Sequence, residues 1–140
     1  MKNRTLLMIP GPIEFEPAVL AALGAPTTSH VAPDFIAAFG QALERTREVF
    51  LAPDGQPFVV AGSGTLAMDM AAANLIEPGD RALVANSGFF GDRMGAILER
   101  YGAQVTHVRA TVGGAPDPAE VDAALAGGDF KLLTITQVDT

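Results

Sequence analysis

Short apolar and β-branched runs alternate with helix-forming segments through the second half of the chain, and this alternation constrains the fold most strongly. We predict strands at residues 58–61, 82–86, 104–108 and 132–136, and helices at residues 65–75, 90–101 and 117–126. The turns between these segments are short and rich in glycine, proline and aspartate. Strands joined by single helices pair in parallel through right-handed crossovers. The sequence therefore predicts an α/β fold, with helices flanking a mostly parallel sheet.

The first part of the chain follows a different pattern. Residues 1–17 contain three prolines, which exclude a helix interior, so we expect an extended arm. Two helices are predicted after the arm, at residues 18–23 and 34–50, and the second has one apolar face. We therefore divide the chain into an arm with two helices, residues 1–54, and the first part of an α/β domain, residues 55–140.

Composition excludes several classes of protein. The chain has 140 residues, of which 49% are hydrophobic and 18% charged, as in a globular domain. Its net charge of −7 argues against a nucleic-acid partner or an anionic membrane surface. It has no cysteine, so we expect neither disulfides nor a thiolate metal site. No apolar run approaches the length of a membrane span or a signal peptide, and we expect a cytoplasmic protein.

A glycine-rich turn follows the predicted strand 58–61 and opens the next helix. The turn reads Gly62-Ser63-Gly64-Thr65. Glycines allow a ligand to approach the backbone, and free amides at a helix start attract anions. The Ser63 and Thr65 hydroxyls add donors at the same place, although either could simply cap the helix. The turn therefore indicates either a phosphate site or an ordinary helix cap.

Three turns follow the carboxyl ends of predicted parallel strands. They are Gly62–Thr65, Ser87–Phe90 and Asp139–Thr140. Ligands of open parallel sheets bind beyond these strand ends. We therefore expect all three turns to line one crevice.

Five motifs in register give the chain a family resemblance. They are Pro10-Gly11-Pro12, Ala61-Gly62-Ser63-Gly64-Thr65, Glu77-Pro78-Gly79-Asp80, Ser87-Gly88-Phe89-Phe90-Gly91-Asp92-Arg93 and Val138-Asp139-Thr140. In this order and spacing they resemble class V aminotransferases of pyridoxal-phosphate fold type I, in the alanine–glyoxylate and serine–glyoxylate group. The resemblance implies that the chain is the N-terminal part of the large domain of such an enzyme, with pyridoxal 5′-phosphate as cofactor.

The resemblance also implies roles for single residues. Ser63, Gly64 and Thr65 match the positions that hold the cofactor phosphate, and Phe90 matches an aromatic residue that stacks on its pyridine ring. Thr140 matches a hydroxyl residue that reaches the ring. Gly11 and His30 match positions on the substrate side, with a structural role for His30 left open. Arg93 could reach the phosphate or lie exposed on its helix, and we expect His107 to be a packed or edge histidine of its strand.

The resemblance implies an amino-group transfer from alanine or serine to glyoxylate or another 2-oxo acid, in a homodimer. Family members are more than twice as long, and their Schiff-base lysine lies beyond residue 140. Lys2 and Lys131 are poorly placed to replace it. We therefore expect no catalytic residue within this chain, and no activity without the remaining C-terminal portion.

Two other functions remain open at this stage. One is a different class V activity that uses the same cofactor, since most substrate-side residues lie outside the chain. The other is a non-catalytic phosphate- or nucleotide-binding α/β module. The lack of an acidic residue about 20 positions after the glycine turn argues against a dinucleotide.

Overall fold

The computed structural model describes residues 5–9 and 11–139. The chain forms two compact units. One unit contains the described residues up to Pro12 together with those from Gly62 onward, and the other contains Ile13–Ala61. The predicted division into residues 1–54 and 55–140 stays a prediction.

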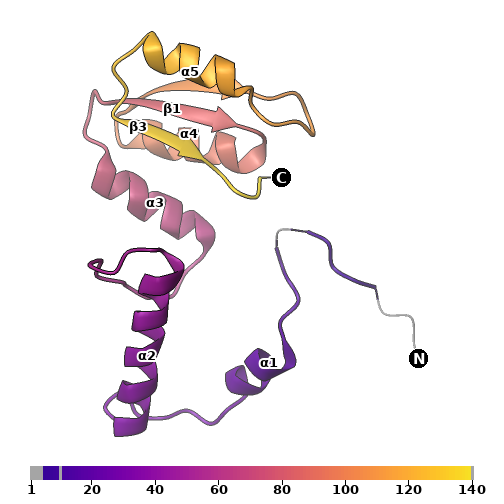
Figure 1. Cartoon of the computed structure of the whole chain (residues 1–140), viewed down its shortest axis with the longest axis vertical. Helices are drawn as coiled ribbons and strands as arrows, with labels where there is room; N and C mark the ends of the chain where they lie inside the picture. The colour runs from indigo at the N-terminus through magenta and orange to yellow at the C-terminus, as the bar shows by residue number, and fades with distance from the viewer. Residues whose placement is uncertain (1–4, 10, 140) are drawn as a thin grey trace. The chain divides into compact units, whose positions relative to one another are not determined.

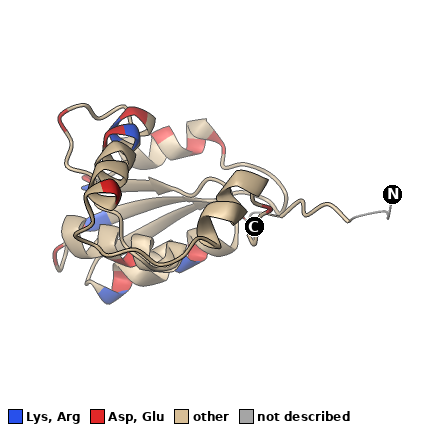
Figure 2. Cartoon of the chain, turned by 90° about the horizontal axis from the view of Figure 1, so that it is seen from below, with Lys and Arg blue, Asp and Glu red and all other residues tan. Residues whose placement is uncertain are grey.

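The larger unit is built on a parallel sheet of three strands in the order β2-β1-β3 (Figure 1). These strands are β1 (Arg81–Asn86), β2 (Gln104–Arg109) and β3 (Leu132–Ile135). Val84 pairs with His107 on one side and with Thr134 on the other. Both pairings are parallel, so the predicted parallel α/β sheet is confirmed. No Lys, Arg, Asp or Glu occurs within these strands except at their ends (Figure 2), as expected for strands covered on both faces.

Helices α3 (Gly64–Leu75), α4 (Phe89–Arg100) and α5 (Pro118–Ala126) complete this unit. Figures 1 and 2 show α4 and α5 on opposite faces of the sheet. The strand order explains this, because the chain crosses from β1 to β2 through α4 and returns past β1 to β3 through α5. Right-handed crossovers in opposite directions place their helices on opposite faces.

The core lies between β1, α4 and α3. Val84 and Leu98 are its largest fully buried side chains, whereas Leu83 is buried on the opposite face of β1. Ala72 and Ile76 extend the cluster to α3 and the residue after it. This packing fixes the positions of the carboxyl end of β1 and the N-termini of α3 and α4.

The smaller unit contains α1 (Pro17–Leu23) and α2 (Pro33–Val49). Phe35 and Phe39 stack along α2 with ring centroids 5.8 Å apart. The Arg47 Nε donates a 2.7 Å hydrogen bond to the Gly55 carbonyl, which closes the loop after the helix. Among the described residues, no helix is long and apolar enough to cross a membrane.

One predicted strand is wrong. Residues 58–61 form no strand, and Phe58, Val59 and Val60 are 79%, 63% and 53% exposed. A strand requires a hydrogen-bonded neighbour, and none of the described strands pairs with this run. Every other predicted helix and strand begins and ends within one residue of the observed element.

Candidate functional site

The glycine turn leads directly into α3. Ser63 is the N-cap of this helix, and its Oγ accepts a 3.3 Å hydrogen bond from the Leu66 amide. Within the described part of the chain, no acceptor meets the amides of Gly64 and Thr65. These amides carry the positive end of the helix dipole, so the start of α3 can accept an anion.

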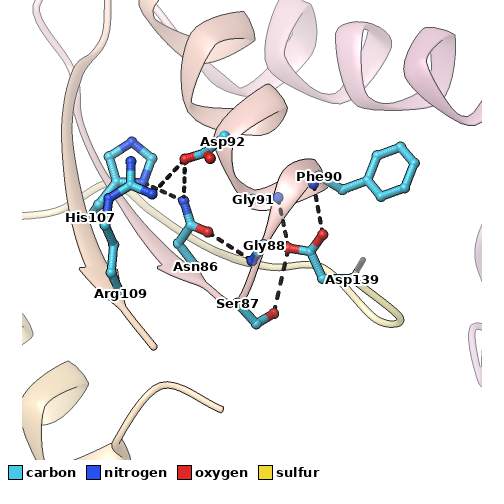
Figure 3. Close-up of polar contacts among 9 residues, drawn as sticks. All are labelled: Asn86, Ser87, Gly88, Phe90, Gly91, Asp92, His107, Arg109 and Asp139. Atoms are coloured by element: carbon cyan, nitrogen blue, oxygen red, sulfur yellow. Dashed lines mark hydrogen bonds and ion pairs between the residues drawn. The ribbon is translucent and has the colours of Figure 1, made fainter. Parts of the chain in front are cut away.

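The start of α4 is occupied by a carboxylate from the same chain (Figure 3). Asp139 Oδ1 accepts a 2.7 Å hydrogen bond from the Phe90 amide, and Oδ2 accepts a 2.9 Å bond from the Gly91 amide. The Ser87 hydroxyl lies 3.5 Å from the same Oδ2. A negative charge at a helix N-terminus is stabilising. Of these two helix starts, only that of α3 therefore remains available to an external anion.

A buried asparagine joins β1, β2 and α4 (Figure 3). Asn86 is 3% exposed, and its Oδ1 accepts a 3.0 Å hydrogen bond from the Gly88 amide. Its Nδ2 lies 2.8 Å from Asp92 Oδ1 and 3.1 Å from His107 Nδ1. Because Nδ2 can only donate, His107 Nδ1 is the acceptor and carries no proton.

Two glycines of α4 allow this close approach. A Cβ on Gly91 would lie 2.6 Å from Asn86 Oδ1, and a Cβ on Gly95 would lie 2.6 Å from the His107 ring. His107 is half-buried against this helix, as predicted for a packed histidine. Glycine at both positions therefore fixes the distance between α4 and the sheet.

Burial lowers the pKa of His107, and the nearby Arg109 lowers it further, while Asp92 and Glu99 act in the opposite direction. The pKa of Asp92 is also lowered, mainly by its hydrogen bond with Arg109 and then by the one with Asn86. The Arg109–Asp92 pair is 2.6 Å long and exposed. The folded state therefore favours the neutral form of His107 and the ionised form of Asp92.

We expect the protein to lose stability as the pH falls from about 7 to about 5. A histidine whose folded pKa lies below its unfolded pKa binds more protons when unfolded, so stability rises with pH across this window. Urea midpoints measured across it should fall more steeply for the parent protein than for His107→Gln, whose amide oxygen can still accept from Asn86. Parallel profiles for the two proteins would contradict this role of His107.

Arg93 lies beside the start of α3. Its Nη1 donates a 2.8 Å hydrogen bond to Thr65 Oγ1. Its guanidinium carbon lies 4.5 Å from the Phe89 ring centroid and 5.5 Å from that of Phe90. The side chain is half-buried, so of the two alternatives from the sequence an exposed helix arginine is wrong.

An open cavity of about 960 Å³ lies at the carboxyl end of the sheet. Gly11, Gly64 and Phe90 line it, together with Phe89, Met68, Ile9 and residues 136–138. The structure thus brings together three of the predicted site residues, from the arm, α3 and α4. Ser63 and Thr65 flank Gly64 in the chain. Exposed His30 belongs to the smaller unit, and Thr140 lies outside the described residues.

Residues 18–140 match the family described as aminotransferase class-V. The chain belongs to the class V aminotransferase family. Its relatives include alanine–glyoxylate aminotransferase 1 of Saccharomyces cerevisiae, which is 41% identical over 99% of this chain and 38% of that protein. The alanine–glyoxylate aminotransferase of Drosophila melanogaster is 32% identical over 96% of this chain and 34% of that protein.

Solved structures of class V aminotransferases share the fold. The ureidoglycine–glyoxylate aminotransferase of Bacillus subtilis superposes with a TM-score of 0.80 and 28% identity, over 95% of this chain and 35% of that one. The alanine–glyoxylate aminotransferase of Nostoc sp. gives a TM-score of 0.74 and 33% identity, over 84% and 31% of the two chains. The chain therefore spans about a third of the length of its relatives and has the fold of the N-terminal part of a fold type I aminotransferase.

Membership of the class V aminotransferase family implies pyridoxal 5′-phosphate as the cofactor. The residues present fit this group. The start of α3 offers amides for a dianionic phosphate, and the Phe90 ring lines a cavity large enough for a pyridine ring. Lys131 fits poorly as the lysine that binds the cofactor aldehyde, because its Nζ is 2.7 Å from Asp80 Oδ2 and its pKa is raised by that hydrogen bond.

Sequence reasoning assigned no role to the side chains of Asn86 and Asp139, and it left two alternatives for Arg93. Asn86 ends β1, Asp139 follows β3, and Arg93 lies on the second turn of α4. The position of Asp139 after a strand end was the available signal, since such positions gather at one edge of a parallel sheet. No local signal decided between the two alternatives for Arg93, because its partner Thr65 is 28 residues away.

Proposed function

We propose that the chain is the cofactor-binding part of a transaminase that moves an amino group from alanine or serine to glyoxylate or another 2-oxo acid. The observation that carries this proposal is the available α3 start beside a cavity lined by Phe90, in a chain of the class V family. The names of the relatives support glyoxylate in particular. Alanine, ureidoglycine and aspartate appear in them as different donors, but glyoxylate recurs.

The chain's own residues have binding and orienting roles in this proposal. The amides of Gly64 and Thr65, with the Ser63 and Thr65 hydroxyls, hold the phosphate. The Phe90 ring stacks on the pyridine ring and keeps water from that face. Bound pyridoxal phosphate supplies the electron sink for transfer of the amino group. The Asp139 carboxylate fixes the backbone of Phe90 by accepting from its amide.

Other parts of the proposal concern the cofactor ring, the substrate and the rest of the enzyme. Thr140 would reach the cofactor ring, and Gly11 and His30 would lie on the substrate side. The lysine that binds the cofactor would belong to the remaining C-terminal portion, in keeping with relatives about three times as long. The homodimer and the cytoplasmic location remain predictions.

Removing either hydroxyl from the α3 turn tests the phosphate site. In the full-length protein, meaning this chain with its remaining C-terminal portion, Ser63→Ala and Thr65→Ala should each weaken cofactor binding about tenfold, the cost of a hydrogen bond to a charged group. Equilibrium dialysis of the cofactor-free protein against pyridoxal phosphate measures the change. Thr65→Ala is the cleaner variant, because it leaves the Ser63 cap in place.

Thr106→Ala provides the matched control, since Thr106 is an exposed threonine of β2. Its dissociation constant should equal that of the parent protein. Unchanged affinity in both the Ser63 and the Thr65 variants would remove the phosphate site from α3. Failure of the parent protein to bind pyridoxal phosphate would overturn the proposed function itself.

A further inference from the structure

Arg93 is held in place by contacts with the starts of two helices, α3 and α4. One guanidinium nitrogen donates to Thr65 Oγ1 at 2.8 Å, and the guanidinium plane lies over the rings of Phe89 and Phe90. Arginine is well suited to this position, because it stacks on aromatic rings and keeps further donors for an anion. The side chain is therefore oriented by groups that carry no negative charge.

The charge of Arg93 lacks a carboxylate partner. Arg109 pairs with Asp92, and Lys131 pairs with Asp80. Among the described residues, no carboxylate forms a salt bridge with Arg93. A half-buried cation has lost part of its hydration, and a nearby anion offsets that cost. In a chain with a net charge of −7, such a cation indicates a place for an external anion.

The Arg93 guanidinium lies close to the free amides at the start of α3. Thr65 is the second residue of α3, and its amide and that of Gly64 meet no acceptor among the described residues. Gly64, Phe89 and Phe90 all line the 960 Å³ cavity. The Thr65 hydroxyl and the Arg93 guanidinium thus lie beside the helix start that lines this cavity, and each of these groups favours negative charge.

We infer that Arg93 is a binding residue for the cofactor phosphate: it supplies the positive charge that balances the dianion and orients the Thr65 hydroxyl. The inference rests on the proposed function and adds the counter-charge, which neither the α3 amides nor the hydroxyls provide. A purely structural Arg93 would instead clamp α4 to α3 and would be indifferent to the phosphate.

Comparison of pyridoxal phosphate with pyridoxal, which lacks the phosphate, separates these two roles. In the cofactor-free, full-length protein, Arg93→Met should reduce the preference for pyridoxal phosphate over pyridoxal about tenfold or more, the effect of one charge-assisted hydrogen bond. Arg93→Lys keeps the charge and should retain part of the preference. Arg100→Met on the same helix is the matched control and should retain all of it, because Arg100 is exposed on the last turn.

The salt dependence of binding gives a second readout, measured in the parent protein and in Arg93→Met. Added sodium chloride should weaken the binding of pyridoxal phosphate more than that of pyridoxal, and this difference should be smaller in Arg93→Met. Equal losses for both ligands in Arg93→Met, or no loss, would overturn the role of Arg93 while leaving the proposed function intact. If the parent protein bound neither ligand, the proposed function would fail and the role of Arg93 with it.

Discussion

Replacing Asn86 with leucine is expected to lower the free energy of unfolding by about 2–4 kcal/mol, although the two side chains are similar in size. The substitution leaves the Gly88 amide without its acceptor at 3.0 Å and His107 Nδ1 without its donor at 3.1 Å. Asp92 also loses its 2.8 Å bond from Asn86. Because Asn86 is 3% exposed, water cannot readily replace these bonds. Urea unfolding of the full-length protein measures the loss.

Asn74→Leu is the matched control for this experiment. Asn74 is an exposed asparagine of α3 whose Nδ2 donates to the Met70 carbonyl, four residues earlier. Its replacement should change the free energy of unfolding by less than about 0.5 kcal/mol. Equal effects of the two substitutions would mean that the buried hydrogen bonds of Asn86 contribute no more to the free energy of unfolding than the exposed bond of Asn74.

Helices and strands were predictable wherever short-range signals agreed. The Asp117-Pro118 start of α5 is an example, because the Asp117 carboxylate accepts from the Ala119 amide and proline occupies the first turn. The run 58–61 has equally good strand composition but forms no strand. Whether this run forms a strand depends on a neighbouring strand to accept and donate its backbone hydrogen bonds, and its composition carries no information about that neighbour.

The candidate site was predictable only in part, for a related reason. The turn at Ser63–Thr65 and the position of Phe90 follow from local pattern and family resemblance. Asp139 accepts from amides 48 and 49 residues away, and such contacts exist only once β3 lies beside β1. The sequence therefore predicted which turns meet at the sheet edge, but not which side chains hold those turns in place.

Phe90→Ala is expected to weaken the binding of pyridoxal phosphate about tenfold or more, and Phe90→Trp to preserve it, because ring stacking supplies roughly 1–3 kcal/mol. The backbone of this position is held through its own amide by Asp139, so truncation of the ring removes stacking without releasing the helix start. Phe89→Ala is the comparison variant and should cause the smaller loss: Phe89 is the preceding residue, lines the cavity and helps to hold Arg93, and it lies edge-on to Phe90 with ring centroids 5.3 Å apart. Dialysis of the cofactor-free, full-length protein, with the absorption spectrum of bound cofactor, measures both effects. Arg93 lies over both rings, so either ring is near enough to the guanidinium to be held by it. A loss in Phe89→Ala as large as that in Phe90→Ala would therefore contradict the assignment of the stacking role to Phe90.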